Sequence, residues 1–293
     1  MYTQLFGGFL LNHALLTANQ LAEAMETAKN TRVKLGVLAI NAGYLTAAQV
    51  DHCYEMQARM DKRMGDIAVE LGYMTEAQVE ELLRTQKSGY LILGQAIMDR
   101  GFLTNAQFEQ ALSDYKNSAT ITEQDFLAET EEKAEEVLNR YYQISPEDAF
   151  DGVTEYISLL MKNLVRFIGD DFSLLKAEKA EYVPAEIMAC QPISGTVNLA
   201  TAVCSDEKSF VVFASRYANE EFTELDEYVE ASVGEFLNLH NGLFTVNMSE
   251  QKNVELELQP QLVERCGFDG AGGGYIIPVQ FSFGVVKFVI ASK

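Results

Sequence analysis

A motif that returns every 29 residues is the feature that most constrains the fold of this chain. Its copies begin at Leu5, Lys34, Arg63 and Ile92. Each copy carries a glycine, a threonine and a glutamine at the same offsets: Gly7, Gly36, Gly65 and Gly94, then Thr17, Thr46, Thr75 and Thr104, then Gln20, Gln49, Gln78 and Gln107. A fixed period of this length indicates one supersecondary unit that is stacked several times.

The Thr-x-x-Gln sequence in each copy predicts the start of a helix. In such a capping box the threonine hydroxyl accepts a hydrogen bond from the third helical amide, and the glutamine side chain bonds back to the threonine amide. Upstream, a short apolar helix is expected to end at Gly43, Gly72 or Gly101, each suited to a left-handed conformation, whereas Ala14 breaks that rule in the first copy. Residues 1–117 are therefore predicted to be an all-α domain of four 29-residue helix-turn-helix units that share a core.

Two of the copies resemble the ligand motif of MshEN-type N-terminal domains in type II secretion and type IV pilus ATPases. Residues 34–57 and 63–86 each match the 24-residue length of that motif, and the five residues between them match its spacer. Such tandems can bind cyclic di-GMP, with one motif for each half of the dinucleotide. The resemblance implies these ligand-binding candidates: Lys34, Leu35, Gly36, Gln57, Arg63, Met64, Gly65 and Gln86.

The same segment also fits a second interpretation. Lys34 stands where the family has an arginine, and it lacks the bidentate guanidinium fork. Met64 replaces a leucine, and the outer copies, which begin at Leu5 and Ile92, lack the cation altogether. Residues 1–117 could therefore be a helical docking module whose glycines only make turns.

Charge and composition exclude several function classes. The net charge of −21 argues against nucleic acid or an anionic membrane as a general partner, because both need a basic surface. No apolar run is long enough for membrane insertion as a helix. The four cysteines form no Cys-x-x-Cys motif, which favours a reduced cytoplasmic protein. The three histidines have no metal-binding spacing, so no metal site is expected.

A change in composition after residue 117 predicts a second domain. Residues 118–145 are polar and then acidic, as expected for a linker with a spacer helix. Residues 146–293 alternate between helical and strand-like patterns, which predicts an α+β domain with an antiparallel sheet covered by two long helices. The helices are expected at residues 146–167 and 222–241, and the strands at residues 194–203, 209–218, 242–249, 254–263, 274–283 and 284–292.

The second of these helices carries Glu235 and Asn238, three residues apart. At about 100° per residue, both lie away from the apolar stripe that includes Val229 and Phe236, so they share the exposed face. Polar side chains on such a face usually do no more than interact with water. Small residues flank the pair, however, and they leave room for another protein to approach closely: Ala231, Gly234 and Gly242.

This segment resembles the active-site helix of the CheC, CheX and FliY chemotaxis phosphatases. Their pattern begins with Asp or Ser, followed by Glu four residues later and by Asn three residues after the Glu. A Pro follows the Asn after 21 intervening residues, and a Gly often stands four residues after the Asn. Glu235 and Asn238 match this pattern, Pro260 has the expected spacing, and Gly242 takes the glycine position. Ala231 replaces the leading Asp or Ser.

A partial echo of the pattern occurs earlier in the chain. Asp151, Glu155 and Ser158 have the spacing, but serine replaces the asparagine. A hydroxyl is a poor substitute for an amide, which has separate donor and acceptor atoms. The echo therefore suggests an internal duplication with one remaining active face, as in CheX-like members of the family.

The resemblance implies hydrolysis of the aspartyl phosphate of a CheY-type response-regulator receiver, in chemotaxis or two-component signalling. The phosphorylated receiver would supply the Mg²⁺ and a lysine, and this chain needs no cofactor of its own. Asn238 would orient the attacking water, and Glu235 would contact the lysine. Cyclic di-GMP would modulate this hydrolase through residues 1–117, and a homodimer is expected. The alternatives are a non-catalytic signalling adaptor and an accessory protein of secretion or pilus assembly.

Overall fold

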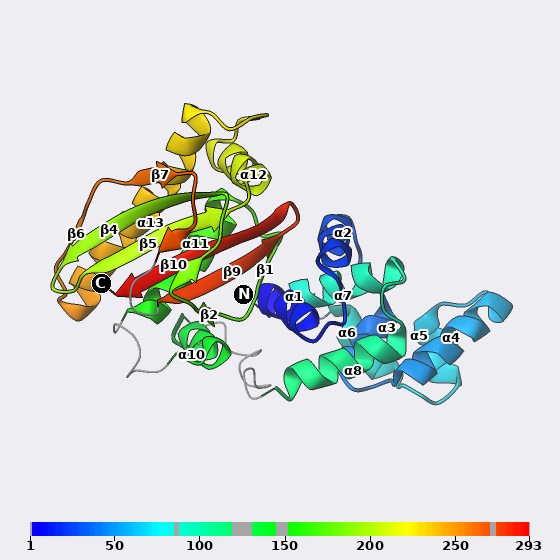
Figure 1. Cartoon of the computed structure of the whole chain (residues 1–293). Helices are drawn as coiled ribbons and strands as arrows, with labels where there is room; N and C mark the ends of the chain where they lie inside the picture. Colours follow the sequence, from blue (N-terminus) through cyan, green and yellow to red (C-terminus); the bar gives the residue numbers. More distant parts are fainter. Residues whose placement is uncertain (1, 85–87, 119–130, 145–151, 270–273, 293) are drawn as a thin grey trace. The chain divides into compact units, whose positions relative to one another are not determined.

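The computed structural model describes residues 2–84, 88–118, 131–144, 152–269 and 274–292. The chain divides into two units, residues 2–118 and residues 119–293. Figure 1 draws the elements of the first unit from blue to green and those of the second from green to red. None of the described helices is both long and apolar enough to cross a membrane.

The first unit is all-helical in its described residues. Its helices are α1 (Tyr2–Asn12), α2 (Ala18–Ala28), α3 (Leu35–Asn41), α4 (Ala47–Met60), α5 (Met64–Glu70), α6 (Glu76–Arg84), α7 (Gly89–Asp99) and α8 (Asn105–Lys116). The predicted capping boxes are confirmed at Thr17, Thr46 and Thr104, which begin α2, α4 and α8. Thr75 and Gln78 exchange the same two hydrogen bonds before α6, at 2.8 and 3.2 Å.

Each helix that precedes a capping threonine is followed by a residue with positive φ. Gly43, Gly72 and Gly101 have φ values of 71°, 70° and 73°, as predicted. Ala14 adopts a φ of 53° at the equivalent place, although its Cβ makes this conformation unfavourable. The turn is therefore made even where the sequence does not supply glycine.

Other glycines in this unit allow one helix to lie directly against the next. A Cβ on Gly36 of α3 would lie 2.8 Å from Val50 Cγ1 of α4, and a Cβ on Gly65 of α5 would lie 2.9 Å from Val79 Cγ1 of α6. A Cβ on Gly94 of α7 would approach the Phe108 ring of α8 to 2.3 Å. These contacts give the recurring glycines a packing role.

The second unit combines helices with antiparallel strands. Its helices are α10 (Glu131–Tyr142), α11 (Val153–Phe167), α12 (Glu207–Ala218) and α13 (Glu227–Lys252). Its strands are β1 (Phe172–Leu174), β2 (Glu178–Lys179), β3 (Tyr182–Val183), β4 (Ile187–Gly195), β5 (Leu199–Ser205), β6 (Leu256–Leu258), β7 (Leu262–Glu264), β8 (Phe268–Asp269), β9 (Tyr275–Phe281) and β10 (Gly284–Ser292).

The main sheet has the strand order β1-β9-β10-β5-β4-β6, with β2 paired to β9 and β7 paired to β4. All of these pairs are antiparallel. Helices α11, α12 and α13 lie on one face of this sheet (Figure 1). The core between the layers is aromatic. The ring centroids of Phe213 on α12 and Phe236 on α13 are 5.0 Å apart, and both rings pack against Phe288 of β10.

The opposite face of the sheet carries a smaller apolar cluster. It is completed by the pair of short strands β3 and β8, which form a separate two-stranded sheet. The buried members of the cluster are Val183, Met188, Ala200, Ala202, Cys204, Phe268, Ile276 and Val289. Both faces of the central strands are therefore covered.

Helix α10 lies in the stretch predicted as a linker, residues 118–145, but it belongs to the second unit. Val137 and Leu138 are buried, and the Tyr141 hydroxyl donates to the Leu174 carbonyl at 2.6 Å. The predicted start of the next helix at Pro146 lies outside the described residues, and α11 ends at Phe167, as expected.

Two predicted strands are wrong. Residues 209–218 form most of α12, which Asp206 caps by accepting a hydrogen bond from the Ser209 amide. Residues 242–249 continue α13, which runs to Lys252. Apolar residues in both segments recur at helical spacing and pack on the sheet, so a third helix covers it in addition to the two that were predicted. Two further predicted strands are each divided in two. Residues 194–203 contain the end of β4 (Ile187–Gly195), a turn and most of β5 (Leu199–Ser205), and residues 254–263 contain β6 and the start of β7.

Candidate functional site

Helix α13 carries the candidate pair and begins later than predicted. Asp226 caps it by accepting hydrogen bonds from the amides of Tyr228 and Val229, so Phe222 lies before the helix. The helix buries an apolar face that includes Val233, Phe236, Leu237 and Phe244. Its opposite face is open along most of its length.

Glu235 and Asn238 lie on the open side of α13, as predicted. Glu235 is exposed, and Asn238 is half-buried. Burial first, and then the negative charge of Glu235, raise the pKa of Tyr217 on α12. The pair therefore lies at the junction between exposed helix surface and packed core.

Asn238 is held by a hydrogen bond from the sheet. The Gln191 side chain on β4 donates from Nε2 to Asn238 Oδ1 at 2.9 Å and to the Gln259 carbonyl at 3.0 Å. Gln191 Oε1 accepts from Asn241 Nδ2 at 2.7 Å, and Asn241 also donates to Thr201 Oγ1 at 2.8 Å. The candidate asparagine is thus the outermost member of a polar network that is otherwise buried.

The segment after β6 brings Pro260 beside this helix. The Gln259 amide donates to the Pro192 carbonyl at 3.0 Å, which fixes this segment to β4. A Cβ on Gly234 of α13 would lie 3.1 Å from Gln261 Nε2, so the helix and the segment are in close contact. Pro260 itself is exposed. The spacing noted in the sequence therefore corresponds to two segments that meet in space.

The two other motif positions on α13 are open. Ala231, which replaces the Asp or Ser of the pattern, is exposed and supplies no polar group. A Cβ on Gly242 would meet only Leu258 Cδ1, at 3.9 Å, which is an ordinary contact distance. The packing of this unit therefore has no need for a glycine at position 242.

The partial echo in α11 does not form a second exposed pair. Glu155 makes an ion pair of 2.5 Å with Lys252 at the end of α13, and both side chains are mostly buried. Ser158 is buried, and Asp151 lies outside the described residues. The open face of α13 is therefore the place where both the Glu and the Asn of the pattern are present and accessible.

A buried histidine lies on the core side of α13. His240 is 1% exposed, and its Nδ1 accepts a hydrogen bond from Asn163 Nδ2 of α11 at 3.1 Å. Burial lowers the pKa of His240 to about 3. The imidazole is therefore neutral near pH 7 and is shielded from solvent.

Four of the cyclic di-GMP candidates in the first unit already have contacts within the chain. Lys34 Nζ makes an ion pair with Asp99 at 2.6 Å, and Gln57 Nε2 donates to the Lys62 carbonyl at 3.1 Å. Gly36 and Gly65 are packed against neighbouring helices. The remaining described candidates are half-buried Leu35, exposed Arg63 and buried Met64, and Gln86 lies outside the described residues.

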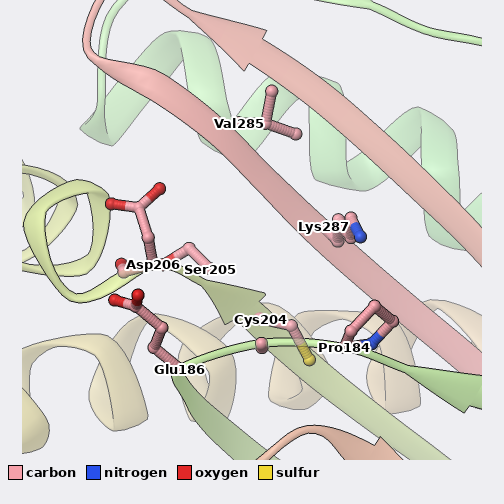
Figure 2. A pocket seen from close by; sticks show the side chains of 8 residues that line it. Pro184, Glu186, Cys204, Ser205, Asp206, Val285 and Lys287 are labelled. Atoms are coloured by element: carbon pink, nitrogen blue, oxygen red, sulfur yellow. Dashed lines mark hydrogen bonds between the residues drawn. The ribbon is translucent and has the colours of Figure 1, made fainter.

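A pocket of about 430 Å³ lies elsewhere in the second unit (Figure 2). Its lining includes Cys204 and Lys287, which are paired across β5 and β10. Because Phe288 points to the helices, Lys287 points to the other face of the sheet. Burial raises the pKa of Cys204 to about 12, so its thiol is not a ready nucleophile. Neither Glu235 nor Asn238 lines this pocket.

Gln191 is the site residue that the sequence reading did not single out. It lies in β4, where Ile187, Ala189 and Ile193 are buried on the same face of the sheet. A polar residue in the middle of an apolar alternation was the available signal. It was missed because the strand was expected to begin only at residue 194.

No protein-family model matches the chain, and no curated protein matches it. Solved structures similar to it include a CheC-like superfamily protein from Shewanella sp. PV-4, with 16% identity and a TM-score of 0.45 over 50% of this chain and 99% of that one. The chemotaxis protein CheX from Vibrio vulnificus has 18% identity and a TM-score of 0.44 over 49% and 100%. The CheX–CheY–BeF₃–Mg²⁺ complex from Borrelia burgdorferi has 14% identity and a TM-score of 0.42 over 50% and 99%.

Proposed function

We propose that this protein hydrolyses the aspartyl phosphate of a CheY-type receiver, with Glu235 and Asn238 as the site. The observation that carries the proposal is the placement of this pair on the open face of α13. Asn238 is anchored there by Gln191 while its Nδ2 group makes no hydrogen bond among the described residues. An ordered amide with a free donor beside an exposed carboxylate suits a site that is completed by a partner.

The chemistry divides between the two proteins. The receiver brings the phosphoaspartate, the Mg²⁺ and a lysine, and Glu235 forms a charge-assisted contact with that lysine. Asn238 holds a water in line with the phosphorus. The water oxygen forms the new bond to phosphorus as the bond to the aspartate oxygen breaks, which releases inorganic phosphate and restores the receiver carboxylate. The acceleration comes from the placement of the water, so no acid or base of this chain has to transfer a proton.

The surface around the pair supports docking of a protein. Tyr228, Glu235, Gly242 and Val246 are spaced seven, seven and four residues apart, so they form one line along α13. Tyr228 is 65% exposed and Val246 is 51% exposed, which is unusual for large apolar side chains. Gly242 lies between them and allows a partner to approach the helix backbone.

The proposal is tested by following the loss of ³²P from a panel of phosphorylated receivers of the same organism. Wild-type protein is expected to accelerate the loss for at least one receiver. Glu235→Ala is expected to raise KM because docking to the receiver lysine is lost. Glu250→Ala, which removes another exposed carboxylate from the same helix, serves as the matched control and should behave as wild type.

A non-catalytic adaptor is the competing account of the same surface. It predicts that a receiver binds to α13 and that its rate of phosphate loss is unchanged by the wild-type protein. Binding without acceleration across the whole panel would therefore reject the phosphatase and leave the adaptor. Acceleration that depends on Asn238 would reject the adaptor.

For residues 1–117 we propose a stack of four 29-residue units that docks or regulates, and cyclic di-GMP binding stays a prediction. Arg63 is exposed and free of ion pairs in the part of the chain that the structure describes. Lys34, in contrast, would have to leave Asp99 to reach a phosphate. Isothermal titration of the full chain with cyclic di-GMP should give a heat change that Arg63→Ala abolishes and Arg59→Ala preserves. No heat change would leave the docking interpretation.

A further inference from the structure

We propose that Gln191 is a positioning residue that fixes the orientation of the Asn238 amide, with the Nδ2 group facing the approaching partner. Its effect on hydrolysis rests on the proposed function, whereas its effect on the Asn238 side chain does not. Gln191 lies on β4, and Asn238 lies on α13, 47 residues later. The link therefore joins the sheet to the open face of the helix.

The orientation of Gln191 follows from what its partners are able to do. The Gln259 carbonyl can only accept a hydrogen bond, so the Gln191 Nε2 end must face it, at 3.0 Å. The second hydrogen on Nε2 then points to Asn238, at 2.9 Å. Only an acceptor can meet it, so Asn238 turns its Oδ1 inward.

The contacts at the other end of Gln191 agree with this orientation. The Thr201 hydroxyl donates to the Gln191 backbone carbonyl at 3.0 Å, which leaves its oxygen to accept from Asn241 Nδ2 at 2.8 Å. The second hydrogen of Asn241 Nδ2 meets Gln191 Oε1 at 2.7 Å. The Gln259 carbonyl therefore sets the orientation of the Gln191 amide, and the bond from Asn241 agrees with it.

Burial makes this orientation hard to reverse. Gln191 is 2% exposed, and Thr201 and Asn241 are both 0% exposed. In such a dry environment an unmade hydrogen bond is not replaced by water. Turning the Asn238 amide over would place two N–H groups against each other at the edge of this network.

The inward oxygen leaves the Asn238 Nδ2 group for the partner. Phosphoryl oxygens are negatively charged, so the group that approaches them must be a donor. An unrestrained asparagine would present its carbonyl part of the time, and the carbonyl would repel these oxygens. The water that attacks phosphorus can accept one hydrogen bond from Nδ2 while its other lone pair faces the phosphorus.

The first test compares Gln191→Met with Gln280→Met. Gln280 is also a buried glutamine of the same sheet, and its side chain donates to the Phe281 carbonyl, away from Asn238. In steady-state assays with a responsive receiver, Gln191→Met should lower kcat by about a hundredfold. It should leave KM unchanged, because Glu235 and the exposed Tyr228 and Val246 remain in place. Gln280→Met should leave both unchanged. A wild-type kcat in a folded Gln191→Met protein would overturn the proposal.

The second test does not depend on hydrolysis. Asparagine-selective ¹⁵N labelling gives the side-chain amide signals, and the Asn238 pair is identified by its absence in Asn238→Ala. This amide should be rigid in wild type and Gln280→Met and mobile in Gln191→Met. An equally rigid Asn238 amide in Gln191→Met would overturn the proposal. If the wild type hydrolyses no receiver, the proposed function fails while this test still decides the positioning role.

Asn238→Asp covers the case in which Gln191→Met fails to fold. An aspartate keeps an inward oxygen for Gln191 but presents an anionic oxygen where the Nδ2 donor was. The half-buried site should tolerate it, so the thermal transition should match that of wild type. We expect kcat to fall as far as in Asn238→Ala. A kcat equal to that of wild type would contradict the outward donor.

Discussion

At the scale of single residues, His240 makes the stability of the second unit depend on pH. In the unfolded chain its imidazole protonates near its ordinary pKa of about 6.5, whereas burial lowers the pKa to about 3 in the folded protein. Between these two values the unfolded state binds more protons. The contribution of His240 to the free energy of unfolding should therefore be nearly constant above pH 6.5. It should fall as the pH drops from 6.5 towards 3.

His240→Gln tests this linkage, because glutamine can still accept from Asn163 but does not titrate. From pH 7 to pH 5 the wild type should lose about 2 kcal/mol that the variant does not lose. Urea unfolding of both proteins at the two pH values, followed by circular dichroism, measures the difference. Equal losses in both proteins would show that His240 does not set this dependence.

Ala14 is a second residue whose environment predicts a measurable effect. Its φ of 53° lies in the left-handed region, where glycine is favoured. Ala14→Gly should raise the free energy of unfolding by about 0.5 kcal/mol, since relief of strain exceeds the added entropy of the unfolded chain. Gly43→Ala, at a φ of 71° with no neighbouring atom in the way, should lower it by about 1 kcal/mol. Thermal melts that show Ala14→Gly less stable than wild type would contradict this reasoning.

At the scale of elements, the sequence predicted those features that depend on neighbouring residues. The threonine caps and the left-handed glycines were predictable because the interacting groups lie within a few residues of each other. Residues 209–218 were predicted to be a strand, because a short apolar segment fits both the helical period and the strand period. These residues form a helix because Asp206 caps its start and because its apolar face packs on the sheet. Packing of this kind is a tertiary effect that the local sequence does not reveal.

The candidate site shows the same division. Glu235 and Asn238 were placed correctly on the open face of one helix, because helical periodicity alone determines that face. The support of Asn238 was not predictable in this way, since it comes from Gln191 and from the Gln259 carbonyl. These groups come from a strand and a loop that only the complete sheet brings beside α13.

Gly242 offers a test of α13 as a docking element. A glycine inside a helix costs about 1 kcal/mol relative to alanine, and a Cβ would fit here without a clash. Gly242→Ala should therefore stabilise the protein by about 1 kcal/mol and yet raise KM for the receiver, because the added methyl group holds the partner away. The control is Asn247→Ala on the same helix, which should leave KM unchanged. A more stable Gly242→Ala protein with a wild-type KM would show that no partner lies against this position.

At the scale of the whole molecule, an all-helical unit is joined to an α+β unit that carries the candidate pair on α13. Glu235 and Asn238 supply a carboxylate and an amide, and the described residues contain no cluster of three or more His, Cys, Asp or Glu side chains that could hold a metal ion. In the proposed function, another protein brings the reacting group to this pair. The account therefore predicts an activity that appears only in a mixture with a phosphorylated receiver.

The most direct test of this claim is the single-turnover rate of phosphate release from a phosphorylated receiver at saturating amounts of the full chain. Wild type, Asn238→Ala and the control Asn247→Ala are compared. Wild type and Asn247→Ala should accelerate release, and Asn238→Ala should return it to the rate of the receiver alone. Acceleration that persists in Asn238→Ala, or no acceleration of any receiver by the wild type, would contradict the account.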